Sequence, residues 1–244
     1  MTVISIDPDP RPVPVAGSPG GSIFRAALGA EFERLHPELR RRFGFSSADG
    51  IACLGTGRME QVERGARLAA PFLRVAARRN ILFPEHGRDV PFTIANYAYR
   101  DGYGRETVTF VRTFQFVRPR RFDATMVASP RAGTVVDYLG THQHLAVDLR
   151  LGVSKRGGLV VSSAAQRVSG WVGAPVLPEL LAGRAELHEW FDEAEGRFRI
   201  RVRVVNPVLG LVAGYRGWFR AEYPRVGAEG VPGHVRPVRE SFRR

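Results

Sequence analysis

Residues 197–204 read Arg-Phe-Arg-Ile-Arg-Val-Arg-Val, and residues 145–153 read Leu-Ala-Val-Asp-Leu-Arg-Leu-Gly-Val. Both stretches carry an apolar residue at every second position, which is the period that lets a β-strand bury one face and expose the other. The first stretch therefore predicts an outer stripe of arginines on the far side of a buried apolar face. Together the two stretches indicate a mainly β (α+β) fold.

The same period, less regular, covers most of the chain after residue 90, and turn sequences such as Asp101-Gly102-Tyr103-Gly104 and Glu195-Gly196 interrupt it. It predicts further strands at 51–60, 90–100, 105–117, 120–129, 133–140, 158–168, 184–194 and 209–222. Because the connections are short, neighbouring strands should pair antiparallel. A sheet of so many long strands curls or closes, so we expect a strongly curved antiparallel meander sheet or a lipocalin-like barrel.

The last predicted strand contains Gly210, Gly214 and Gly217. Glycines inside a strand indicate a bulge or the close approach of another backbone. This pattern lacks the strand–turn–helix context of a dinucleotide-binding fingerprint. We therefore expect the last strand to close the sheet at these glycines.

Two helical segments are predicted, one before the first strand and one after it. Ser22 is a suitable N-cap for a helix over 22–43, which Pro37 should divide into two short helices. We expect these two N-terminal helices to cover one end of the sheet. A further helix is predicted at 66–79. Its predicted buried face consists of Leu68, Phe72, Val75 and Ala76.

Length and composition indicate one folded domain with tails. The chain has 244 residues, of which 44% are hydrophobic and 25% charged, which is enough apolar material for one sizeable core. Residues 1–22 contain five prolines and end in a glycine-rich run, so they predict a disordered leader. Residues 224–244 predict a basic flexible tail, which leaves 23–223 as the single domain.

The net charge of +12 and the sequence pI of about 11.1 raise the question of a nucleic-acid partner. However, 35 of the 36 basic residues are arginine, and they are scattered rather than gathered in one run. We therefore expect no nucleic-acid partner. No stretch approaches the ~20 apolar residues of a membrane span, residues 1–22 lack a signal-peptide pattern, and the single Cys53 cannot form an internal disulfide. These features together favour a cytoplasmic location.

The strand predicted at 105–117 is the most informative about function. One of its faces holds Val108, Phe110, Arg112, Phe114 and Phe116. A guanidinium among phenylalanines needs a carboxylate, a set of carbonyls or an anionic ligand, because an unpaired buried charge is costly. Arg112 is therefore either a clamp inside a pocket or a residue at the rim of the sheet with its head in water.

Other polar residues give weaker signals. His142 and His144 have the spacing of a β-strand metal site, with Asp148 as a third ligand, but loop histidines more often face solvent, and we expect no metal there. Glu186 and His188 share a strand face, which suits acid–base chemistry and equally a wet surface. Of Asp137 and Tyr138, one should face inward, and Tyr138 can bury its ring and offer a hydroxyl. No phosphate-binding loop, nucleophile elbow or zinc motif is present.

Several motifs in this order resemble a bacterial domain family of unknown function. They are Phe24-Arg-Ala-Ala-Leu-Gly29, Arg112-Thr-Phe114, Gly140, Asn206-Pro207 with Gly210, and Tyr215-Arg-Gly217-Trp218. Members of that family are found alone or attached C-terminal to saccharopine-dehydrogenase-like reductases. The resemblance implies no activity and no catalytic residue, but it raises the possibility of a reductase partner.

We expect a pocket for a largely hydrophobic small molecule inside the curved sheet. Its predicted walls are Phe110, Arg112, Phe114, Phe116, Tyr138 and Trp218. Such a pocket needs no cofactor to promote cyclisation or isomerisation of its ligand, because positioning and one hydrogen bond to a carbonyl suffice. The alternative is a non-catalytic carrier or accessory protein that presents the ligand to a reductase or another biosynthetic partner.

Overall fold

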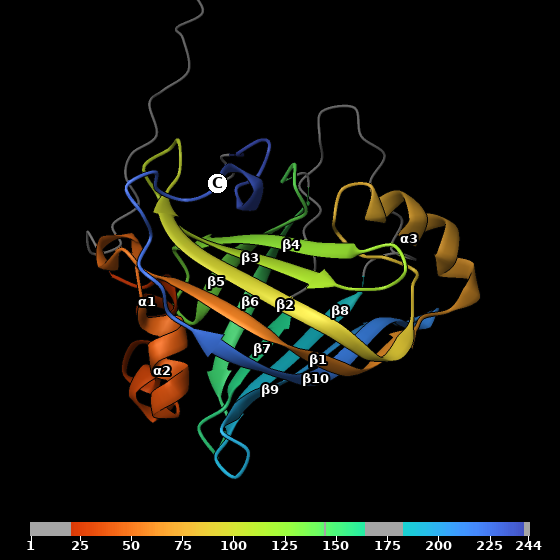
Figure 1. The fold of residues 1–244 in the computed structure, drawn as a ribbon, viewed down its shortest axis with the longest axis horizontal. Coiled ribbons are helices and arrows are strands. Elements are labelled where there is room, and N and C mark those ends of the chain that lie inside the picture. Colours follow the sequence, from red (N-terminus) through yellow and green to blue (C-terminus); the bar gives the residue numbers. More distant parts are fainter. Residues whose placement is uncertain (1–20, 144, 164–182, 242–244) are drawn as a thin grey trace, which may run out of the picture.

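The computed structural model describes residues 21–143, 145–163 and 183–241, and it is dominated by one sheet (Figure 1). The predicted leader lies outside the described residues except for its last two positions, and so do His144 and the end of the strand predicted at 158–168. The strands are β1 (Ala52–Arg64), β2 (Gly87–Arg100), β3 (Glu106–Phe114), β4 (Arg120–Ala128), β5 (Thr134–Leu139), β6 (Leu145–Val153), β7 (Leu159–Ser163), β8 (Arg184–Asp192), β9 (Arg197–Asn206) and β10 (Gly210–Glu222).

The ten strands form a closed antiparallel barrel in which each strand pairs with its neighbours in sequence, and β10 returns to pair with β1. This confirms the mainly β fold class. The register of β9 also agrees with its sequence pattern: Ile200 and Val202 are buried in the interior, whereas Arg201 is exposed on the outside. Alternation along the strands therefore separates a dry interior from a charged outer surface.

The closure between β1 and β10 depends on glycine. A Cβ atom on Gly217 would lie 2.2 Å from the carbonyl oxygen of Arg58, and one on Gly57 would lie 2.0 Å from the carbonyl oxygen of Trp218. Any larger residue would force these strands apart. The register of this strand pair also shifts between Arg58 and Gln61. The Cβ distance at Gly217 confirms the close approach predicted for the glycines of the last strand.

Short helices at the N-terminus cover one end of the barrel (Figure 1, left). The Ser22 side chain accepts hydrogen bonds from the backbone of Phe24 and Arg25 and so caps α1 (Ile23–Leu28). A 3₁₀ turn, η1 (Gly29–Arg34), leads to α2 (Pro37–Gly44), which has its proline in the first turn. The predicted division at Pro37 is confirmed. A further turn, η2 (Ser47–Asp49), leads into β1.

The helix α3 (Ala70–Ala77) lies at the opposite end of the barrel (Figure 1, right). Its buried residues are Leu73 and Ala76, whereas Leu68 and Val75 are 83% and 61% exposed. The predicted buried face was therefore wrong apart from Ala76 and the half-buried Phe72. Leu68 belongs to the preceding 3₁₀ turn, η3 (Arg67–Ala69), so a helical period counted from it selects the wrong side.

The segment after β10 is the one for which the sequence predicts a basic flexible tail. Its described part runs over the outer surface and includes the turn η5 (Gly233–Val235), in which Val235 is buried. The backbone nitrogens of Val226 and Val238 donate to the carbonyl oxygens of Gly50 and Thr141. Within the described residues, no helix is both long and apolar enough to cross a membrane.

Candidate functional site

The barrel encloses a cavity of about 140 Å³ between its two helical ends. Phe24 of α1 and Phe43 of α2 close it at one end, and Phe72 of α3 and Leu82 contribute at the other. The side walls are mostly leucine, isoleucine and valine from the inward faces of β6 to β9. The composition of the walls makes the cavity apolar except where charged side chains enter it.

Arg112 enters the cavity from β3 and is 5% exposed. Its Nη1 donates a hydrogen bond of 3.2 Å to the hydroxyl of Tyr215, and its guanidinium lies 3.8 Å from the ring centroid of Phe122. Its Nε has no hydrogen-bond partner among the residues that the structure describes. The structure therefore places Arg112 in the interior rather than at the rim, with one donor unused.

Asp137 enters the same cavity from β5 and is 6% exposed. Burial raises the pKa of its carboxyl to about 7, although the positive charge of Arg112 acts to lower it. Its Oδ1 also lacks a hydrogen-bond partner within the described part of the chain. Sequence reasoning placed Tyr138 in the wall of the pocket, but the inward-facing residue of the two is Asp137.

Pairing across the sheet locates the two charged groups relative to each other. Val108 pairs with Met126, which in turn pairs with Asp137, so these three share one level of the interior. Arg112 lies two inward-facing positions beyond Val108 on β3. The two side chains approach the cavity from different levels, and Arg112 Nε and Asp137 Oδ1 are both fully buried without a hydrogen-bond partner among the described residues.

The structure places the six predicted wall residues at different sites. Phe110 and Arg112 line the cavity. Phe114 faces inward but is fully buried beyond the cavity against Phe83 and Phe92, and Phe116 follows the end of β3 with its ring 5.8 Å from that of Phe83. These phenylalanines pack the barrel rather than contact the cavity.

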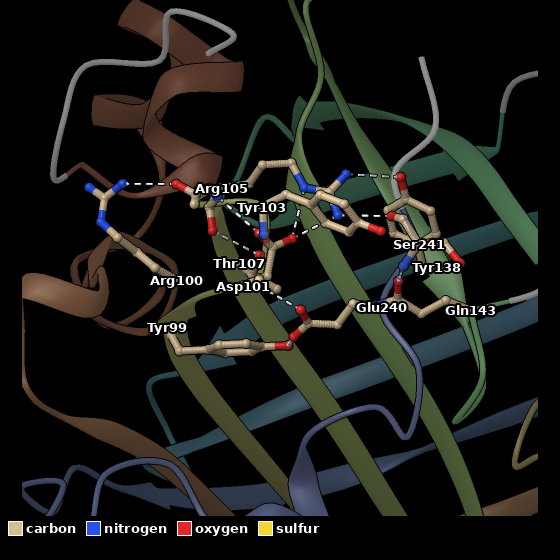
Figure 2. Close-up of polar contacts among 12 residues, drawn as sticks. Tyr99, Arg100, Asp101, Tyr103, Arg105, Thr107, Tyr138, Gln143, Glu240 and Ser241 are labelled. Carbon is tan, nitrogen blue, oxygen red and sulfur yellow. Dashed lines mark hydrogen bonds and ion pairs between the residues drawn. The ribbon is translucent and has the colours of Figure 1, made fainter. Parts of the chain in front are cut away.

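Tyr138 and Trp218 lie on the outside of the barrel, which corrects their assignment to the walls. Asp137 faces inward, so the next residue must face outward. The Tyr138 hydroxyl accepts a hydrogen bond of 3.2 Å from Arg105, in a cluster that includes Ser241 (Figure 2). Trp218 is the neighbour in sequence of the inward-facing Phe219, and its ring centroid lies 4.4 Å from Cζ of the Arg197 guanidinium.

A second buried arginine, Arg42, projects from α2 into the barrel and was not predicted. Its Nε donates to the carboxylate of Glu189, and its Nη1 donates to Asn96 Oδ1 at 2.8 Å and to Cys53 Sγ at 2.9 Å. Burial raises the pKa of Glu189, and Arg42 opposes that effect. The available signal was a lone glutamate on the otherwise apolar side of β8, between Leu187 and Phe191.

The histidine candidates do not assemble a site. His142 contacts the hydroxyl of Thr141 through Nδ1 at 2.9 Å, and His144 lies outside the described residues. His188 stacks on Trp190 with ring centroids 4.8 Å apart, on the outer side of β8. No group of three potential metal ligands occurs within residues 21–143, 145–163 and 183–241.

The molecule is thus a ten-stranded antiparallel barrel with a largely apolar cavity, whose charged lining residues are Arg112, Asp137, Glu186 and Glu189. The chain belongs to the family described as domain of unknown function DUF4166, which matches residues 35–219. It is similar to the "Uncharacterized protein YndH" of Bacillus subtilis (strain 168), with 31% identity over 202 residues that cover 82% of this chain and 97% of that protein. No solved structure matches the chain.

Proposed function

We propose that the barrel binds a largely hydrophobic small molecule in its cavity, with one polar group of the ligand against Arg112. The observation that carries the proposal is a buried guanidinium in the wall of an apolar cavity, with no carboxylate partner in the described part of the chain. A buried charge without a partner is costly. A ligand oxygen beside the guanidinium would offset that cost, while the apolar remainder of the ligand would gain from leaving water.

The size of the cavity limits the ligand. An engineered cavity of about 150 Å³ in another protein stays dry and binds benzene, and the cavity here has a similar volume of about 140 Å³. The expected ligand is therefore a compact ring compound or a short folded chain with a single oxygen-bearing group. A larger ligand would have to displace the side chains that close the cavity, such as Phe24 and Phe72.

Such a site supports a cofactor-independent isomerisation or cyclisation. An apolar chamber holds a flexible molecule in few conformers, which brings reacting atoms together. A fixed guanidinium at one oxygen stabilises the negative charge that develops there in the transition state. A carrier for a reductase or another biosynthetic partner would use the same cavity and release its ligand unchanged, so ligand turnover distinguishes the two functions.

The first test is native mass spectrometry of the protein purified from its own host, in which we expect a bound compound of low mass. The recovered compound is then titrated into the wild type and into Arg112→Met. Loss of one charged hydrogen bond should weaken binding by roughly 1.5–3 kcal/mol. Arg201→Met is the matched control, because Arg201 is exposed on the outside of β9. Equal affinities for all three proteins would refute the proposal.

A further inference from the structure

Two side chains that line the cavity have polar atoms without hydrogen-bond partners in the described part of the chain. Arg112 presents a donor that nothing in the described part of the chain accepts, and Asp137 presents a carboxyl oxygen that nothing there contacts. Both belong to buried side chains that line the same cavity. In folded proteins, buried polar atoms are nearly always paired, so two open ones in one chamber need an explanation.

Packing alone does not provide that explanation. The inward neighbours of Asp137 across the sheet are Met126 and Val147, which offer no hydrogen bond from their side chains. An apolar residue at this position would remove the cost of burying the carboxyl. Glu189, by comparison, is equally buried but is held by Arg42. Asp137 is therefore a buried acid without a hydrogen-bonding or ion-pair partner in the described part of the chain.

We propose that Asp137 is the acid–base residue of this cavity, and that it moves a proton on a carbon next to the carbonyl of a hydrophobic ketone whose oxygen lies against Arg112. This inference rests on the proposed function and specifies its substrate class and reaction. The cavity admits such a compound, and Arg112 and Asp137 reach it from two levels of the wall.

The step balances without a co-reactant. The Asp137 carboxylate takes a proton from the carbon beside the carbonyl, the electron pair of that C–H bond forms a carbon–carbon double bond, and the carbonyl π pair moves to the oxygen. The resulting enolate oxygen faces the Arg112 guanidinium. The Asp137 carboxylic acid then returns the proton to the same carbon, which gives isotope exchange, or to the far carbon of an adjacent double bond, which gives an isomer.

The electrostatic surroundings of Asp137 suit this role. Burial brings its pKa to about 7, so both protonation states are populated near neutral pH, as an acid–base catalyst requires. The charged group that acts on it is Arg112 on β3. Glu186 and Glu189 of β8 also line the cavity, and Glu189 forms an ion pair with Arg42 of α2.

The test uses cyclohexanone and cyclopentanone as probes in deuterated buffer. Binding is followed by calorimetry, and deuterium uptake at the carbons beside the carbonyl is followed by mass spectrometry. We expect both ketones to bind and at least one to exchange faster than in buffer. Asp137→Asn should keep the fold and the binding but slow protein-dependent exchange by about 100-fold or more. Asp148→Asn, an outward-facing change on the neighbouring β6, should leave the exchange rate unchanged.

A measurement on the wild type alone keeps the inference testable if Asp137→Asn does not fold. The exchange rate should rise with pH through the same midpoint at which carbon-13 NMR shows the Asp137 carboxyl ionising. Binding without faster exchange, or exchange that survives in Asp137→Asn, would overturn the role of Asp137 and leave the binding function intact. Failure of both ketones to bind would overturn both proposals.

Discussion

Two arginines are buried inside this barrel, and their surroundings differ. Arg42, at the end covered by α1 and α2, is bound by a carboxylate, an amide oxygen and a thiol. Arg112, in the wall of the cavity, has one phenol and one aromatic ring as neighbours and no carboxylate within ion-pair distance in the described part of the chain. Both arginines also have a fully buried nitrogen without a hydrogen-bond partner there, Nη2 in Arg42 and Nε in Arg112.

The difference separates an arginine that the chain itself pairs from the one that we propose binds a ligand. The Arg42–Glu189 ion pair attaches α2 to β8, so it holds the helical cover on the barrel. Arg112 and Asp137 line the cavity and form no ion pair within the described residues, which leaves their charges for a ligand to pair. A buried arginine by itself therefore does not mark a site; the lack of a carboxylate partner in the described part of the chain, beside a cavity, does.

The largest effect should come from breaking the Arg42 pair. Arg42→Met leaves the Glu189 carboxylate buried without its partner, which should lower the free energy of unfolding by about 3–5 kcal/mol. Chemical denaturation measures the loss. The double variant Arg42→Met/Glu189→Leu should recover a large part of it, because no charge is left stranded. If the double variant is no more stable than the single one, the pair does not have this structural role.

The second effect concerns Asp137 and depends on pH. Its pKa is raised in the folded state from 3.8 to about 7, so the folded state binds the extra proton. The associated stability is fully present below pH 4 and is lost as pH rises through 7. Asp137→Asn removes this dependence. Relative to wild type, the variant should therefore gain stability as pH rises from about 4 to about 7, by at most roughly 4 kcal/mol over that range. Parallel stability–pH curves for the two proteins would show that the carboxyl is not held in an apolar site.

The third effect tests whether the interior is dry on the β9 side. Val202→Asp places a carboxylate on the buried face and should cost about 3 kcal/mol, because a charge enters an apolar wall. Arg201→Ser, one residue away on the outer face, should change stability by less than about 0.5 kcal/mol. Thermal melts of both variants give the comparison, and equal melting temperatures would contradict the inside–outside assignment.

The smallest effect should come from Arg112. Arg112→Met keeps most of the side-chain volume and removes both a desolvated charge and an unused donor, so the free energy of unfolding should change by about 1 kcal/mol or less. The contrast with Arg42→Met, measured by the same denaturation, is the informative quantity. A loss as large as that of Arg42→Met would make Arg112 a second structural anchor and would remove it from the proposed site.

The local sequence pattern was sufficient to predict most of the strands, because the alternation of apolar and polar residues repeats over many positions and turn residues mark the strand ends. It was less decisive where both faces of a strand are buried. On β3 it identified the inward face, although Thr107 and Thr109 on the outer face are as buried as the inward phenylalanines because the segment that follows β10 crosses this part of the surface. On β5, Tyr138 is buried on the outer side for the same reason. Alternation in burial then no longer identifies the inside.

The sequence by itself determined the antiparallel meander, the inside and outside of β9, the break at Pro37 and the glycine closure, because each depends on residues close together in the chain. Only the tertiary structure decided that Asp137 shares a cavity with Arg112 and that Glu189 meets Arg42, which lies 147 positions earlier. Barrel closure and register bring such residues together, and register depends on the packing of all ten strands at once.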